Sequence, residues 1–144
     1  MTNGVSSNSK TITTDEYFQN FCRETLDRHY FIRSAAIADH LGHLLATACR
    51  QGLGQLLTSE ESSRAAAQAA IRAATRNKFK SKIGELQFSL SRYDKLVRAT
   101  VPIKSGQKSR FLLLLTFDSE AEADSIIQKR ILPCIAENKD YFLQ

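Results

Sequence analysis

The sequence predicts an α/β (α+β) fold, a single domain in which helices flank a five-stranded, mainly antiparallel sheet in the order α-β-β-α-β-β-β-α. Three observations support it. The chain has 144 residues, the length of one ordinary domain. Segments with helical spacing of apolar residues bracket segments with alternating spacing. The predicted strands follow one another through short turns, and such neighbours pair antiparallel.

The first helix is expected over residues 14 to 29. Thr13 and Glu16 fit a capping box, and apolar residues recur beyond them at helical spacing. The preceding residues, 1–12, are polar and lack periodicity, so we expect a disordered lead followed by one domain over 13–144. This lead has no apolar segment, so we expect no signal peptide.

A hairpin and an alanine-rich helix come next. Two short β-compatible segments, 31–39 and 43–49, flank Asp39-His40-Leu41-Gly42, which has the composition of a turn. The second helix is expected over 59–80. Thr58 and Glu61 fit a capping box at its start, and alanine has the highest helix propensity.

Three further strands and a last helix complete the chain. The strands are expected at Leu86 to Leu90, at Leu96 to Ile103 and at Phe111 to Phe117. In the middle strand the buried side is predicted to carry Val97, Ala99, Val101 and Ile103. A third capping box, Ser119 with Glu122, predicts the start of the last helix, and Pro133 predicts a kink or an early end. The segment Tyr141-Phe142-Leu143 is expected to dock on the core.

The hairpin from Ala36 to Ala46 resembles that of roadblock/LC7 domains, in which an apolar strand ends in Asp, turns through Gly and returns apolar. The predicted element order is likewise similar to the roadblock/LC7 and profilin-like architecture. Roadblock-type domains dimerise and act as scaffolds or regulators of small GTPases, so the resemblance implies a homodimer and a GTPase partner.

A second resemblance covers residues 15 to 136. There the chain looks like a family of small archaeal proteins of unknown function, and this resemblance implies no activity. The stretches that carry it are Glu60–Ser63, Ala70–Arg76, Tyr93–Pro102 and Ile131–Pro133.

The positive charge is concentrated in the middle of the chain. The net charge is +5, yet the segment from Arg64 to Arg110 holds twelve basic residues against two acidic ones. Its candidate partner-binding residues are Arg72, Arg76, Lys78, Lys80, Lys82, Arg92 and Arg98. Such a segment attracts acidic protein surfaces or phosphates. Three interpretations stay open: an ordinary solvated surface, docking of an acidic protein, and nucleic-acid binding through residues 72–110.

The alanines of the second helix form two adjoining stripes that allow another backbone to come close. One interpretation is a homodimer contact, as in roadblock-like domains, with a two-fold interface formed by Ala66, Ala69, Ala70 and Ala73. A second interpretation is a close crossing over the chain's own sheet. Helix propensity alone is a third explanation of the same composition.

We expect no catalytic, metal or cofactor site. His40 and His43 could form a metal site with Asp39 or Cys49, but a turn does not impose the geometry that a helical pair of ligands would have. The segment Gly52-Leu53-Gly54 lacks the third glycine of a nucleotide-binding loop. The three cysteines have apolar neighbours, so we expect buried thiols in a reducing compartment.

These observations favour a non-catalytic interaction or regulatory module in the cytoplasm, homodimeric, which docks an acidic partner through its basic surface. The first alternative is a small-ligand sensor, which requires an internal cavity of about 300 Å³ or more. The second alternative is the nucleic-acid binder, which requires binding that weakens steeply with salt.

Overall fold

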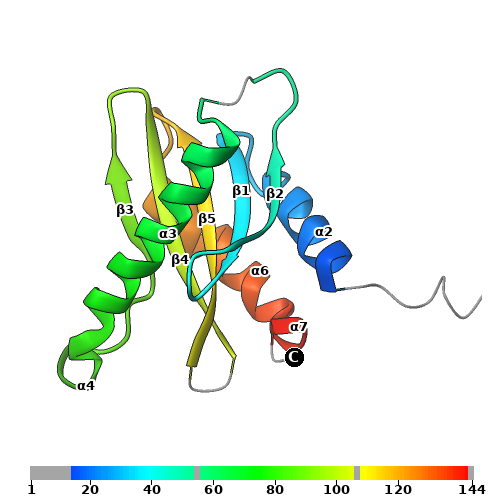
Figure 1. Ribbon diagram of the computed structural model, residues 1–144. Coiled ribbons are helices and arrows are strands. Elements are labelled where there is room, and N and C mark those ends of the chain that lie inside the picture. Colours follow the sequence, from blue (N-terminus) through cyan, green and yellow to red (C-terminus); the bar gives the residue numbers. More distant parts are fainter. Residues whose placement is uncertain (1–13, 54–55, 106–107, 143–144) are drawn as a thin grey trace, which may run out of the picture.

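The computed structural model describes residues 14–53, 56–105 and 108–142 (Figure 1). Among them, no helix is both long and apolar enough to cross a membrane. The elements in chain order are α2 (Thr14–Leu26), β1 (Ile32–Asp39), β2 (Leu44–Cys49), α3 (Ser59–Arg76), the 3₁₀ turn η1 (Asn77–Phe79), α4 (Lys80–Ile83), β3 (Ser89–Arg92), β4 (Leu96–Ser105), β5 (Lys108–Asp118), α5 (Ala123–Ile126), the π-helical η2 (Ile127–Ile131), α6 (Leu132–Glu137) and α7 (Lys139–Phe142).

The five strands form one sheet in the order β2-β1-β5-β4-β3, and every neighbouring pair is antiparallel. This arrangement confirms the predicted fold class. Helix α3 crosses one face of the sheet, whereas α2, α6 and α7 lie on the other (Figure 1). The strands β2 and β3 form the two edges of the sheet.

The main core lies between the sheet and the helices α2 and α5 to α7. The predicted alternation of β4 is confirmed, because Val97, Ala99, Val101 and Ile103 are all buried. Rings from both ends of the chain meet here: Phe18 of α2 stacks on Phe142 of α7, with centroids 5.9 Å apart. Phe142 therefore docks on the core as predicted, and its neighbour Leu143 lies outside the described residues.

The opposite face carries a thinner core. Ala66, Ala69 and Ala70 of α3 are buried against small and medium side chains of the sheet, namely Ala38, Leu112 and Leu114. Because alanine extends only one carbon from the backbone, the helix lies close to the strands. The predicted capping box at the start of α3 is confirmed: the Glu61 N–H donates to Thr58 Oγ1 at 3.1 Å, and the Thr58 N–H donates to Glu61 Oε1 at 2.9 Å.

The turn between β1 and β2 also touches α3. Gly42 has a φ of +92°, and a Cβ placed on it would lie 2.5 Å from the Cα of Ala67. The turn therefore needs glycine twice, once for the left-handed backbone and once for the close approach.

Two helix boundaries differ from the prediction. Helix α2 ends at Leu26 instead of residue 29, because the Arg50 guanidinium binds the carbonyls of Leu26 and His29, which ends the helical ladder there. The capping box predicted at Thr13 lies outside the described residues. Helix α3 ends at Arg76, and the chain continues through η1 and α4 until Gly84, whose φ is +91°.

The strand predicted at Leu86 to Leu90 is wrong in position. The chain pairs with β4 only from Ser89 to Arg92, because the Leu86 N–H is held by the side chain of Asn77 instead of by a strand. Leu90, in this edge strand, is 40% exposed.

Two predictions about the end of the chain had different outcomes. Ser119 does not cap the last helix. The structure has no side-chain cap there, and α5 begins at Ala123. The interruption predicted from Pro133 is confirmed: the π-helical η2 precedes it, and Pro133 lies in the first turn of a new helix, α6. This placement suits a residue that lacks an N–H.

We predict that Gly42→Ala destabilises the protein more than Gly52→Ala does. Gly52 also has a positive φ, +85°, but a Cβ placed on it would have no other atom within 4 Å. The strain of a left-handed alanine costs about 1 kcal/mol at either site. Only at Gly42 must the turn also move off α3, which costs about 1–3 kcal/mol more. Urea unfolding of both variants checks this, and equal losses would contradict the close contact.

Candidate docking surface

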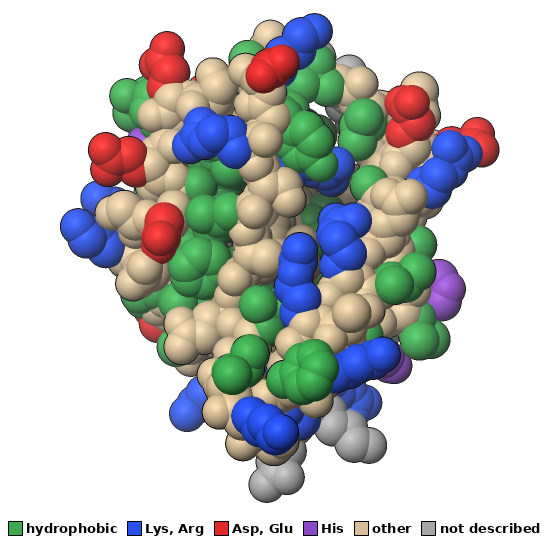
Figure 2. All heavy atoms as spheres, turned by 90° about the vertical axis from the view of Figure 1, so that its left-hand side faces the viewer, with side chains coloured by type: hydrophobic (Ala, Val, Ile, Leu, Met, Phe, Trp, Pro, Cys, Tyr) green, Lys and Arg blue, Asp and Glu red, His purple; other side chains and the backbone are tan. Residues whose placement is uncertain are grey.

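Half of the large exposed apolar side chains lie on one side of the molecule. We define the α3–β3 face as residues 71–93 without Leu90 and Arg92, together with the side of β4 that faces α3. Leu90 is paired with Ala99 and Arg92 with Val97, so these two side chains lie on the other face of the sheet. Of the eight large hydrophobic side chains exposed among the described residues, four belong to this face: Ile71, Phe79, Ile83 and Tyr93. Ile83, the most exposed, is 80% accessible. Figure 2 looks onto this side of the molecule and shows green and blue side chains together at its lower end. Exposed apolar groups in one place mark interaction surfaces.

The predicted basic residues of α3, η1 and α4 lie on the same face. Their side chains are exposed, and within the described part of the chain none of them forms an ion pair with a carboxylate: Arg72, Arg76, Lys78, Lys80 and Lys82. The cause lies in the sequence, because no acidic residue occurs between Glu61 and Glu85. Part of this charge also complements the dipole at the end of α3.

Arg72 and Arg98 line the same narrow groove between α3 and the strands β3 and β4. The groove has a volume of about 30 Å³. Most of the residues that line it are small or polar. The lining consists of Ala65, Ala69, Arg72, Ser89, Ser91, Tyr93, Arg98, Ala99, Thr100 and Leu114. This volume is far below the roughly 300 Å³ of internal cavity that the small-ligand sensor requires, and the larger groove beside α5 and η2 is open to the surface.

Arg92 lies apart from the other predicted basic residues. It is paired with Val97 in the register of β3 and β4, so its side chain points to the opposite face of the sheet from that of Arg98. There it donates a hydrogen bond to the carbonyl of Ser119 at 2.9 Å. It also lines an open surface groove of about 590 Å³ beside α5 and η2. The predicted basic patch is therefore divided between two faces.

The alanines predicted to form a dimer contact lie on the side of α3 that faces the sheet. Ala66, Ala69 and Ala70 are buried against the chain's own sheet, and Ala73 packs beside them. The close crossing over the sheet is thus the interpretation that the structure shows for these side chains. A contact between two copies has to use other residues of this helix.

Three exposed apolar side chains remain available for a contact between two copies, and none of them was singled out from the sequence. No role was predicted for Ile71, Phe79 or Ile83. They lie in three successive elements, α3, η1 and α4, so helical spacing alone does not place them on one side. Their exposure became apparent only in the tertiary structure.

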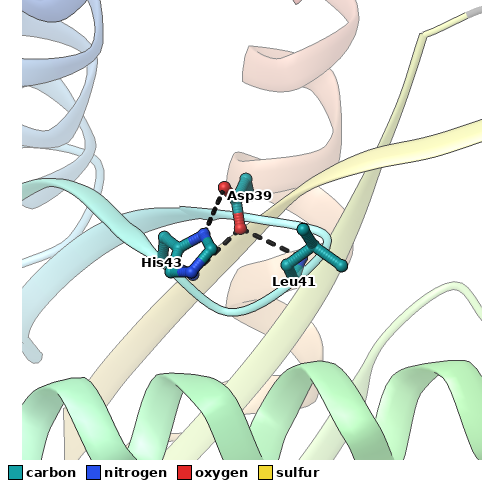
Figure 3. A network of polar contacts seen from close by, with 3 residues as sticks. All are labelled: Asp39, Leu41 and His43. Carbon is teal, nitrogen blue, oxygen red and sulfur yellow. Dashed lines mark hydrogen bonds and ion pairs between the residues drawn. The ribbon is translucent and has the colours of Figure 1, made fainter.

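Asp39 organises the turn that His40 and His43 occupy (Figure 3). Its Oδ1 accepts hydrogen bonds from the backbone N–H groups of Leu41 and His43, at 3.0 and 2.9 Å, and its Oδ2 lies 3.0 Å from His43 Nδ1. Partial burial raises the pKa of Asp39, but these contacts with His43 and Leu41 outweigh it and bring the pKa below its ordinary 3.8.

The other candidates for chemistry are also placed. Within the described ranges, no group of three or more His, Cys, Asp or Glu residues could hold a metal ion.

Burial raises the pKa of the Cys22 thiol to about 12, which keeps it protonated and unreactive. Cys134 is buried too, whereas Cys49 is exposed, so the prediction of three buried thiols is wrong for Cys49. Cys49 lies at the end of the edge strand β2, where its side chain points away from the core.

We predict that Asp39→Ala costs about 1–2 kcal/mol of stability at neutral pH, because the two backbone N–H groups of the turn lose their acceptor. Asp39→Asn keeps an oxygen acceptor and serves as the control, with a smaller loss. Because the pKa of Asp39 is lowered in the folded state, its contribution is present above pH 3.8 and is lost as the pH falls further. Thermal unfolding measured as a function of pH should show the loss of the Asp39 contribution in the unchanged chain but not in Asp39→Ala or Asp39→Asn. A loss of equal size in Asp39→Asn would contradict the role of the carboxylate.

Comparison with known proteins identifies the fold of this chain but does not assign it to a family. No protein-family model matches the sequence, and no curated protein matches it either. The archaeal resemblance therefore stays a prediction.

Three solved structures show the likeness. The gliding protein MglB from Thermus thermophilus is 17% identical over 91% of this chain and 92% of its own, with a TM-score of 0.72. A structure described as MglB with tetrameric arrangement is 17% identical over 91% of both chains, also with a TM-score of 0.72. A roadblock/LC7 domain from Streptomyces avermitilis is 13% identical over 88% of this chain and 98% of its own, with a TM-score of 0.67. The chain therefore has the fold of roadblock/LC7 domains, as the hairpin at residues 36–46 predicts.

Proposed function

We propose that this chain is a non-catalytic interaction module that forms a homodimer and docks an acidic protein partner in the cytoplasm. The observation that carries the proposal is the α3–β3 face, where exposed apolar side chains lie beside cations that have no carboxylate partner among the described residues. The fold supports it, because the roadblock resemblance implies dimerisation and a regulatory role toward a small GTPase.

The dimer contact that the geometry favours uses β3 and the exposed apolar side chains of α3, η1 and α4. Among the described residues, strand β3 is an edge strand that pairs only with β4, so its outer backbone groups have no strand partner there. Such edges pair readily with another chain. Ile71 is 67% exposed, Phe79 is 62% exposed and Ile83 is 80% exposed, and a two-fold contact would cover them in both copies at once. The tetrameric arrangement described for one MglB structure supports oligomerisation of this fold.

The docking surface is the cationic end of α3 with η1 and α4. Arg76, Lys78, Lys80 and Lys82 are exposed there within seven residues of sequence. Clustered charge of one sign steers an oppositely charged partner into place and increases the association rate. An acidic protein is favoured over nucleic acid, because the roadblock resemblance implies a small GTPase as the partner.

We predict that Ile71→Glu converts the dimer to a monomer. Because the Ile71 side chain is 67% exposed, the charge should leave the fold intact and act on the contact between copies. Light scattering at low and at high salt gives the mass. The unchanged chain should be a dimer at both, because an apolar contact depends little on ionic strength.

Tyr30→Glu is the matched control for this test. Tyr30 is 71% exposed and lies in the connection between α2 and β1, outside α3, η1 and α4. Its variant should keep the mass of the unchanged chain. A monomeric unchanged chain, or two variants that behave alike, would contradict a dimer through this face.

We predict that the double variant Lys80→Glu, Lys82→Glu weakens binding to a small GTPase about tenfold at low salt, because two attractive charges become repulsive. Calorimetry with purified small GTPases of the source organism measures this. Lys139→Glu, an exposed residue of α7, is the control and should leave the affinity unchanged. If the unchanged chain binds none of the GTPases and instead binds a DNA duplex, with an affinity that the double variant loses, the nucleic-acid alternative replaces this proposal.

A further inference from the structure

We propose that the groove between α3 and the strands β3 and β4 is a binding site for a phosphate group, which Arg72 and Arg98 would hold together with neighbouring hydroxyls. One chain supplies all of these side chains, so the inference does not rest on the dimer or on the protein partner proposed above. The inference rests on three observations: the register of β3 and β4, the residues of α3 that face these strands, and the two arginines that line the groove between them.

The floor of the groove is a block of donor side chains on one face of the sheet. Arg98 is paired with Ser91, and Thr100 with Ser89, in the register of β3 and β4. Paired residues have Cβ atoms about 4.5–5.5 Å apart and point to the same side. The neighbour of Arg98 on its other side, in β5, is Thr116. Arg98 is therefore flanked by hydroxyls in both directions, with no carboxylate in either adjacent position.

The helix side of the groove leaves space and adds the second cation. Ala65, Ala69 and Arg72 follow one another at four and three residues, so they form one stripe of α3 above the block. The two alanines are short and keep the groove open, whereas Arg72 reaches over it. The residues one turn before and after Arg72, Gln68 and Arg76, carry no negative charge.

The groove is thus lined by two arginines and, among the described residues, by no Asp or Glu. Arg98 is half-buried, and no carboxylate lines the groove or pairs with either arginine within the described ranges. A charge that is partly removed from water without a counterion raises the energy of the empty site. An oxyanion would supply the missing charge, and the planar fork of arginine matches phosphate oxygens in two parallel hydrogen bonds.

The charge and the size of the groove select the ligand. Two cations are balanced by a phosphate that carries close to two negative charges, whereas a carboxylate balances only one. The volume of about 30 Å³ has room for about two water molecules, which is the scale of one oxyanion and not of a whole metabolite. Any larger phosphate ester would insert its phosphate alone.

The test uses inorganic phosphate as the probe, with the unchanged chain and single variants. Calorimetry and thermal unfolding are run with phosphate and with chloride at equal ionic strength. We expect phosphate to raise the unfolding temperature above the chloride value. Arg72→Gln and Arg98→Gln should each weaken phosphate binding about tenfold, since each removes charge-assisted hydrogen bonds. Because Arg72 is exposed, its variant tests the site even if Arg98→Gln disturbs the strand.

Arg76→Gln is the matched control. It removes the same charge one turn further along α3, outside the groove, and should leave phosphate binding unchanged. Equal weakening by Arg76→Gln and Arg72→Gln, equal affinity for acetate and phosphate, or no difference between phosphate and chloride would each overturn the proposal.

Phosphoserine added as a third probe separates the sources of the phosphate. Binding of phosphoserine as well as phosphate assigns the site to phosphate esters, and binding of phosphate alone assigns it to the free anion. Either result supports the site. The solution mass of each variant, measured in parallel, separates a failure of this site from a failure of the dimer.

Discussion

The close contact between α3 and the sheet is the constraint on which the α3–β3 side of the molecule depends. Three buried alanines and the Cα of Ala67, against which Gly42 lies, hold the helix near the strands. Alanine buries little area, so this contact contributes less hydrophobic free energy per residue than the aromatic core on the other face. The helix compensates with a high intrinsic propensity and a complete capping box at Thr58 and Glu61.

This asymmetry between the two faces explains where the exposed groups lie. On the face of α2 and α5 to α7, large side chains interlock, and Phe18, Phe117 and Phe142 leave almost no accessible surface. On the face of α3, a single helix covers the sheet. Beyond α3 the chain continues through η1 and α4. Ile71 near the end of α3, Phe79 in η1 and Ile83 in α4 are all exposed. The same arrangement leaves a narrow groove beside β3, because alanines cannot fill the space between helix and strands.

The charges on this side are sorted by the register of the strands. Arg92 and Arg98 belong to one basic segment of the sequence, yet the pairing of Arg92 with Val97 and of Arg98 with Ser91 sends them to opposite faces. A shift of one residue in this register would exchange the two faces. The groove with Arg72 and the hydrogen bond from Arg92 to Ser119 therefore both follow from one pairing. The density of positive charge was visible in the sequence, but its division into two sites was not.

The sequence by itself determined the order of the elements, the buried side of β4, the capping box at Thr58 and the interruption at Pro133. Each of these follows from residues close together in the chain, where spacing and local hydrogen bonds decide the outcome. Only the tertiary structure decided which side of α3 is buried, where β3 begins, and that Arg72 and Arg98 line one groove. Those outcomes depend on segments that are distant in sequence, such as Gly42 with Ala67 and Asn77 with Leu86, and on packing that no local pattern encodes.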